Sequence, residues 1–273
     1  MAKRKRLTTT KSIEKRIEEG RCKKDGKDYI PWYKVQDVAS AGVSLKTFSP
    51  LTKRQHHLLS RLESNYFYIL EWSEKVIDIK EQYAILDIDE TIEIASSLGY
   101  KHPFDPKTRN IVPITTDFLI EIERDGKNVF LSRTLKYTKD LTKRTLQKFE
   151  IEKTYWKRRG IDWGIVTEQM IDKNIIDNII WIRKAKSIDG IPDLDTNKVS
   201  FIEQILWNEI ETNNRRIVDI ATKVTSDLGL LPGTGLFVIR HLLANKIWRV
   251  AMNKPINPDT KLEILERRIP LYT

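Results

Sequence analysis

Two β-strand patterns that meet at Asp125-Gly126 constrain the fold of this chain more than any other stretch. In the first pattern, TTDFLIEIER, apolar and polar residues alternate with a period of two, which puts Asp117 on the face opposite Phe118. Asp-Gly is a strong hairpin signal because glycine readily adopts the positive φ that a tight turn requires. Residues 115–136 are therefore predicted to form a β-hairpin.

This hairpin would bring polar residues from distant positions to one end. Asp117 lies near the start of the first strand, and Thr134 and Lys136 lie near the end of the second, two residues apart on one face. A carboxylate and an amine gathered in this way are typical of an active site. They are equally compatible with a surface salt bridge on a solvent-exposed hairpin, and these residues alone leave both interpretations open.

The composition describes a soluble globular protein. The chain has 273 residues, 40% of them apolar and 32% charged, which is enough for one large or two medium domains. No apolar run is long enough to span a membrane, and the basic start lacks the apolar segment of a secretory signal. A single cysteine, Cys22, excludes an internal disulfide and a multi-cysteine zinc site. We expect a cytoplasmic protein without a membrane partner.

The net charge of +10 is concentrated near the amino terminus. Residues 1–34 contain twelve Lys or Arg and five Asp or Glu. Such a cluster attracts phosphate backbones without regard to sequence. A solubilising tail would have the same composition, but the seven Trp and nine Tyr that accompany the charge favour a nucleic-acid partner.

A helix is predicted over residues 49–72, with Glu63 at the margin of its apolar stripe. A carboxylate there is costly unless it is paired, hydrogen bonded or bound to a metal, although it could also lean out to solvent. His56 and His57 cannot share one helix face, so they are predicted to be surface or packing groups and not a metal pair. The apolar stripe consists of Leu58, Leu59, Leu62, Tyr66, Ile69 and Leu70.

The other patterns predict a mixed α/β fold in which helices cover a central sheet. The further predicted helices are 12–19, 88–98, 141–159 and 174–183, and the further predicted strands are 32–38, 44–48, 76–83 and 163–167. The proposed parts are a basic arm with its first helix at 1–25, a catalytic domain at 26–185, a linker at 186–198 and a carboxy-terminal domain at 199–273.

The carboxy-terminal domain shows the element order of a winged helix. Three helical patterns are followed by a strand pattern at 246–252 and a short run at 262–265. The third helix, 233–245, contains Arg240 and His241 and is the candidate DNA-recognition helix. A small protein-interaction domain would have the same order. The three helical patterns are 199–211, 215–228 and 233–245.

Glu63, Asp117 and Lys136 together suit metal-assisted hydrolysis of a phosphodiester. Two carboxylates can hold one or two Mg²⁺ ions, which prefer oxygen ligands. A bound metal ion lowers the pKa of a water molecule and neutralises charge on the scissile phosphate. A lysine nearby can orient the nucleophile or stabilise the transition state.

Six segments of the chain resemble the TnsA family, the endonuclease subunits of heteromeric bacterial DNA transposases. The resemblance is dense over residues 26–183 and weaker beyond 199. It implies a restriction-endonuclease-like fold, with Glu63 and Asp117 as catalytic carboxylates and Lys136 as the catalytic lysine. The segments are GKDYIPW at 26–32, HHLLSRLE at 56–63, VIDIKEQY at 76–83, TTDFLI at 115–120, RTLQKFEIEKTYW at 144–156 and, more loosely, WGIVTE at 163–168.

The resemblance also implies a metal site with two departures from the usual motif. We expect Mg²⁺, replaceable by Mn²⁺, on Glu63, Asp117, the backbone carbonyl of Leu135 and the hydroxyl of Thr134. Thr134 stands where such motifs usually carry Glu or Gln, and a hydroxyl is a weaker ligand than a carboxylate. The proline that usually precedes the aspartate is also displaced, because Pro113 lies four residues before Asp117.

The partners follow from the resemblance alone. TnsA-like subunits cut the 5′ ends of a transposon, while a TnsB-like DDE transposase cuts and joins the 3′ ends, and a TnsC-like ATPase regulates both. The expected partners are therefore double-stranded DNA at the transposon ends and these two proteins. Two other functions stay open: a catalytically silent DNA-binding scaffold that uses the winged helix, and a restriction nuclease that acts alone.

Overall fold

The computed structural model describes residues 8–38 and 43–268, and the chain divides into two compact units between Ile171 and Asp172. The linker predicted at 186–198 lies beyond this division. Helix α5 (Lys173–Arg183) consequently belongs to the second unit and not to the first. Within the described residues, no helix combines the length and the hydropathy that crossing a membrane demands.

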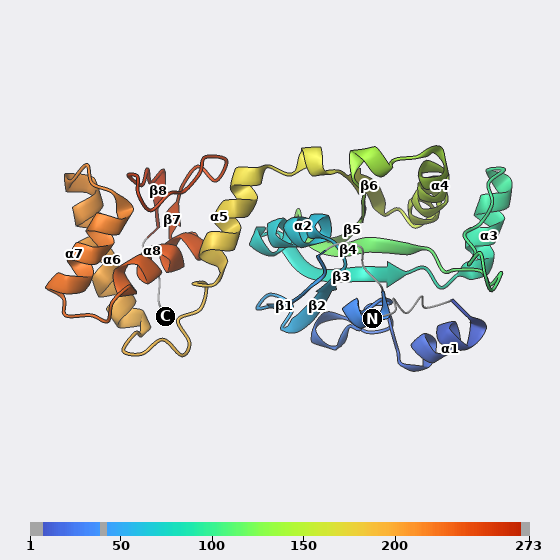
Figure 1. Cartoon of the computed structure of the whole chain (residues 1–273), viewed down its shortest axis with the longest axis horizontal. Coiled ribbons are helices and arrows are strands. Elements are labelled where there is room, and N and C mark those ends of the chain that lie inside the picture. The colour runs from blue at the N-terminus through green and yellow to red at the C-terminus, as the bar shows by residue number, and fades with distance from the viewer. Residues whose placement is uncertain (1–7, 39–42, 269–273) are drawn as a thin grey trace. The chain divides into compact units, whose positions relative to one another are not determined.

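The first unit is built on a four-stranded mixed sheet with the strand order β3-β4-β5-β6. The first three strands are antiparallel, and β6 runs parallel to β5. Figure 1 shows β3, β4 and β5 along the centre of this unit. The strands are β3 (Val76–Ala84), β4 (Thr115–Arg124), β5 (Lys127–Leu135) and β6 (Asp162–Val166).

The predicted hairpin is confirmed. Asp125 and Gly126 both have positive φ angles, 53° and 70°, and Arg124 pairs with Lys127 across them. Two successive left-handed residues give the turn whose twist matches that of the flanking strands. The register brings the start of β4 level with the end of β5.

Helices cover both faces of this sheet, as predicted for a mixed α/β fold. Leu119 of β4 packs with Ile94 of α3 and Ile151 of α4 on one face. On the other face, the ring of Phe118 lies 5.8 Å from the ring of Tyr66 in α2. The helices of this unit are α1 (Thr10–Glu18), α2 (Arg61–Trp72), α3 (Ile88–Ser97) and α4 (Lys143–Arg158).

The helix predicted over residues 49–72 is wrong in its first half. Residues 50–53 form a turn between β1 (Leu45–Ser49) and β2 (Arg54–Leu58), and α2 begins only at Arg61. Arg54, His56 and Leu58 are buried at alternate positions, which is a strand pattern. The strand predicted at 32–38 is also wrong, since a 3₁₀ turn occupies Val35–Asp37.

The second unit is helical, and its three predicted helices are confirmed. A two-residue pairing of β7 with β8 follows them, which is much shorter than the predicted strand at 246–252. Buried Glu203 of α6 joins this pairing to the helices, because it accepts hydrogen bonds from Trp248 and Arg267. The elements are α5, α6 (Thr196–Thr212), α7 (Ile217–Asp227), α8 (Thr234–Ala244), β7 (Trp248–Arg249) and β8 (Glu266–Arg267).

Helix α8 is the centre of this unit. Seven of its eleven residues are buried, and the others are partly exposed. The guanidinium of Arg240 donates to the carbonyl of Trp181, and Nδ1 of His241 hydrogen bonds with the carbonyl of Ala185 at 2.8 Å. His241 is buried and does not face solvent as a DNA-reading residue would, whereas Arg240 is partly exposed and is held by the carbonyl of Trp181. A role of α8 in DNA recognition stays a prediction.

Candidate active site

Glu63 lies in the first turn of α2 and is buried, with 7% of its surface exposed. Ser60 caps the helix by accepting a hydrogen bond from the backbone N–H of Glu63. Oε2 of Glu63 in turn accepts the N–H of Leu59 at 2.9 Å. The amino end of a helix favours a negative charge. The alternative that Glu63 leans out to solvent is thereby excluded.

Asp117 lies where the pairing of β4 with β5 ends. The last paired residues are Phe118 and Arg133, and beyond them Oδ2 of Asp117 accepts the backbone N–H of Leu135 at 2.6 Å. The side chain has thus replaced a strand–strand hydrogen bond. The hairpin therefore brings Asp117 directly to the segment that precedes Lys136.

Gln82 of β3 connects the two carboxylates. Its amide Nε2 lies 3.1 Å from Oε2 of Glu63 and 3.4 Å from Oδ1 of Asp117. This bridge joins Asp117 to helix α2, on the face that also carries Phe118. Asp117 was predicted to lie opposite Phe118, and the prediction fails because regular alternation is lost at this end of the strand.

Burial governs the electrostatics of the pair. It raises the pKa of Glu63 to about 7, and the neighbouring charge of Asp117 adds to the effect. Burial likewise raises the pKa of Asp117 to about 7, although the N–H of Leu135 opposes the shift. Two neighbouring carboxyls that cannot both ionise easily form a site that a proton or a cation stabilises.

The side chain of Thr134 points to a third carboxylate, that of Glu152 in α4. Its hydroxyl donates to Oε1 of Glu152 at 2.5 Å, and the hydroxyl of Thr116 donates to the same oxygen at 2.5 Å. Glu152 is 2% exposed, and burial raises its pKa to about 7. No pattern in the sequence gives Glu152 a role, because only the fold brings α4 to the end of β5.

Lys136 follows β5 directly, and its backbone N–H donates to the carbonyl of Val166 at 3.0 Å. Its positive charge acts to lower the pKa of Asp117, against the larger effect of burial. The charge of Lys136 thus acts at the carboxylate of Asp117. The predicted trio of Glu63, Asp117 and Lys136 consequently gathers at one end of the sheet.

The site offers few protein ligands to a metal ion. Across the described residues there is no group of three or more His, Cys, Asp and Glu side chains with metal-site geometry. Mg²⁺ needs no such group, since it usually keeps several water ligands and binds one or two carboxylates. Glu63, which is buried, and Asp117, which is partly exposed, together fit that requirement.

Two basic residues of α4 extend the site. Arg144 and Lys148 lie one helical turn apart. Burial lowers the pKa of Lys148, and the charges of Arg144 and Lys136 lower it further. Arg144 and Lys148 therefore extend the positive charge from Lys136 along α4.

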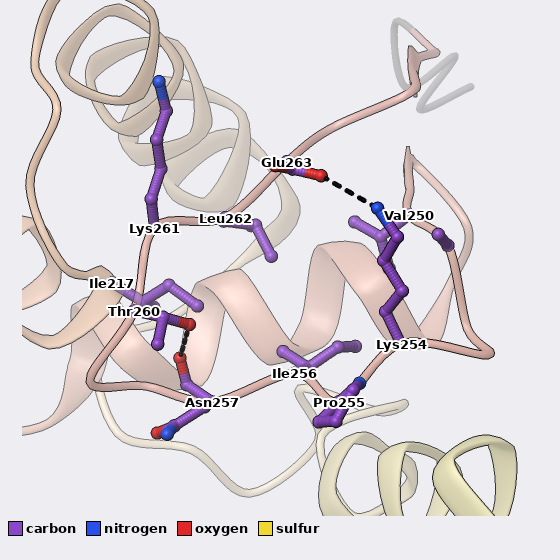
Figure 2. A pocket seen from close by; sticks show the side chains of 11 residues that line it. Ile217, Val250, Lys254, Pro255, Ile256, Asn257, Thr260, Lys261, Leu262 and Glu263 are labelled. Atoms are coloured by element: carbon purple, nitrogen blue, oxygen red, sulfur yellow. Dashed lines mark hydrogen bonds and ion pairs between the residues drawn. The ribbon is translucent and has the colours of Figure 1, made fainter.

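A cavity of about 460 Å³ in the second unit has no pair of carboxylates like that of Glu63 and Asp117 among its lining residues. Figure 2 shows apolar side chains inside it, among them Ile217, Ile256 and Leu262. At its edge the ammonium of Lys254 lies 3.5 Å from the carboxylate of Glu263, which is therefore already paired. The catalytic candidate is accordingly the site on the sheet.

Comparisons with known proteins show which family both units resemble. The TnsA-like endonuclease N-terminal family model matches residues 73–168, and the TnsA endonuclease C-terminal model matches residues 171–252. The two matches meet where the compact units divide. The transposition protein TnsA of transposon Tn7 from Escherichia coli is 36% identical over 245 residues, which cover 90% of this chain and 87% of the relative. The chain therefore belongs to the TnsA family of DNA endonucleases that act in transposition.

Proposed function

We propose that this protein is a Mg²⁺-dependent endonuclease that cuts the 5′ ends of a transposon during cut-and-paste transposition. The observation that carries the proposal is the bridge of hydrogen bonds from Glu63 through Gln82 to Asp117, with Lys136 at the same end of the sheet. The two carboxyl groups favour a bound cation. The positively charged Lys136 beside them would attract a phosphate group.

Glu63 and Asp117 would hold the ion, together with the backbone carbonyl of Leu135. When bound, Mg²⁺, or Mn²⁺ in its place, would activate a water molecule and neutralise charge on the scissile phosphate. Thr134 is the least supported of the predicted ligands, because its hydroxyl already donates to Glu152. Its proposed part is to orient Glu152 beside the site.

The remaining groups would bind and orient the DNA. The ammonium of Lys136 would orient the attacking water or stabilise the charge that develops on the phosphate. Arg144 and Lys148 would contact the backbone of the same strand, which gives affinity without sequence preference. Arg240 and His241 would contribute little to sequence recognition, because both hydrogen bond with backbone carbonyls near α5.

The partners of this activity are inferred from the family. A TnsB-like DDE transposase would cut and join the 3′ ends, and a TnsC-like ATPase would regulate the pair, with the second unit as its proposed contact. The relative's name describes it as a transposition protein of Tn7, which supports a role within such a system.

Strand-specific cleavage of transposon-end DNA tests this proposal. We expect nicks at the 5′ ends only when Mg²⁺ and the DDE partner are both present. Cutting of plain DNA by this chain alone would instead indicate a restriction nuclease. DNA binding that persists in a chelator, with no cutting under any condition, would indicate a silent scaffold and would contradict the proposal.

A further inference from the structure

The backbone of Gln82 departs from the strand that contains it. Its φ is 49°, in the left-handed region that residues other than glycine rarely adopt. Left-handed residues of this kind are concentrated at functional sites, where the surrounding structure holds them. No turn explains the angle, because Gln82 lies inside β3, between Glu81 and Tyr83, which both pair with β4.

The left-handed backbone decides where the side chain points. Neighbouring side chains of a regular strand point to opposite faces. Glu81 nevertheless contacts His56 of β2, whose ring lies 4.5 Å from that of Phe67 in α2, and Gln82 contacts Glu63 of the same helix. Glu81 and Gln82 thus both reach the side of the sheet that α2 covers.

The segment that includes GKDYIPW fastens this backbone in place. The N–H of Trp32 donates to the carbonyl of Gln82 at 3.0 Å, and the hydroxyl of Tyr29 donates to the carbonyl of Glu81 at 2.8 Å. Trp32 is fully buried, so the donor cannot move easily. No side chain of this motif belongs to the proposed active site. Its hydrogen bonds instead hold the backbone of Glu81 and Gln82 in place.

We propose that Gln82 is a positioning residue of the nuclease centre, which holds the carboxylates of Glu63 and Asp117 together so that both can bind one divalent cation. The inference rests on the proposed function. The Gln82 amide and the N–H of Leu59 both donate to Oε2 of Glu63, which fixes the orientation of that carboxylate. Groups that orient metal ligands in this way typically change metal affinity by about 10- to 100-fold when they are removed.

Two substitutions separate positioning from folding. Gln82→Asn keeps an amide and suits a left-handed backbone better than glutamine, but it is one methylene too short to reach both carboxylates. Gln82→Met keeps the length and removes the donor. Gln55→Asn is the matched control, because Gln55 is exposed on β2.

Calorimetric titration of the full chain with Mg²⁺, and with Mn²⁺, gives the first readout, and cleavage at increasing Mg²⁺ gives the second. We expect Gln82→Asn and Gln82→Met to weaken metal binding by about tenfold or more. Cleavage should recover at high Mg²⁺, and Gln82→Asn should unfold at or above the wild-type denaturant midpoint. Gln55→Asn should match the wild type throughout.

The possible failures are distinguishable. If the wild type neither binds these ions nor cuts, the proposed function falls and this inference falls with it. If the wild type binds and cuts, and Asp117→Ala does neither, then wild-type metal affinity in both Gln82 variants overturns the positioning role alone. A lower denaturant midpoint in Gln82→Asn with unchanged metal affinity also overturns it, since the residue would then be structural.

Discussion

The hydroxyl of Thr134 donates a hydrogen bond of 2.5 Å to Oε1 of Glu152 and so ties the end of β5 to the middle of α4. Thr134 occupies the strand position at which related nuclease motifs usually carry a carboxylate or an amide. A carboxylate therefore lies beside this position although the strand residue has none. Thr134, the residue that departs from the usual motif, is thus held in place by its hydrogen bond to Glu152.

Replacing Thr134 tests this hydrogen bond. Thr134→Val leaves the buried carboxylate of Glu152 with one donor fewer, which should reduce the free energy of unfolding by about 1–3 kcal/mol. The loss should be larger at pH 8.5 than at pH 6, since burial raises the pKa of Glu152 to about 7 and the ionised form needs the donor more. Thr134→Ser keeps the hydroxyl and should behave like the wild type. Urea unfolding at the two pH values measures both effects, and equal losses in the two variants would contradict the account.

The raised pKa of Glu152 also predicts how stability depends on pH. Between its ordinary value of 4.5 and about 7, the folded protein holds a proton that the unfolded chain has lost. Stability without metal should therefore fall as the pH rises through this range, by on the order of 3 kcal/mol for this carboxyl. Glu152→Gln should remove this part of the slope in a chelator-containing buffer and leave the part that comes from the raised pKa values of Glu63 and Asp117. An unchanged slope in that variant would show that the carboxyl is ionised in the fold.

The hairpin could be predicted from sequence because its information is local. Asp125-Gly126 dictates the turn, and the turn dictates which ends of the strands meet. The position of Glu63 at the margin of a buried helix stripe was likewise readable, although its helix begins only at Arg61. The mistaken helix over 49–58 shows the limit of this approach, because leucine and histidine in a short run fit both a helix and a strand.

Gln82 and Glu152 could not be predicted, because neither has a local signal. The position of Gln82 depends on a left-handed angle and on donors that come from residues about fifty positions away. Glu152 acquires its place only when α4 packs onto the sheet. Two of the groups closest to the catalytic candidates are thus products of the tertiary fold.

The buried ion pairs of Glu81 in β3 with Arg54 and His56 in β2 give a third prediction. Glu81 accepts two hydrogen bonds from Arg54, at 3.0 and 2.6 Å, and one from His56 at 2.8 Å. Although burial acts to raise it, the pKa of Glu81 is held at about 2 by His56 and Arg54. Glu81→Gln should leave Arg54 without a counter-charge and cost about 3–5 kcal/mol of stability.

An exposed ion pair provides the control for that variant. Asp219 and Arg216 of the second unit are paired at 2.7 Å on the surface, so Asp219→Asn should change the denaturant midpoint little. Chemical unfolding at pH 7 compares the two. A Glu81→Gln protein as stable as Asp219→Asn would mean that the buried pairs do not support β3.

The basic residues of α4 predict a salt effect on DNA binding. Arg144→Ala and Lys148→Ala should each weaken binding to any sequence and lower the slope of log affinity against log salt by about 1. Lys153→Ala is the control on the same helix, because its ammonium is already paired with Glu150 at 2.8 Å. Fluorescence anisotropy at several salt concentrations measures the slopes. Equal slopes in all three variants would place the DNA elsewhere.

Cleavage of the 5′ strand by the Asp117→Ala variant is the most direct test of the central claim. The assay uses end-labelled transposon-end DNA, Mg²⁺ and the DDE partner, with DNA affinity and the denaturant midpoint measured in parallel. The variant should retain its fold and most of its DNA affinity, and 5′ cleavage should be abolished while the partner still cuts the 3′ strand. Continued 5′ cleavage by this variant would contradict the assignment of Glu63, Asp117 and Lys136 as the nuclease site.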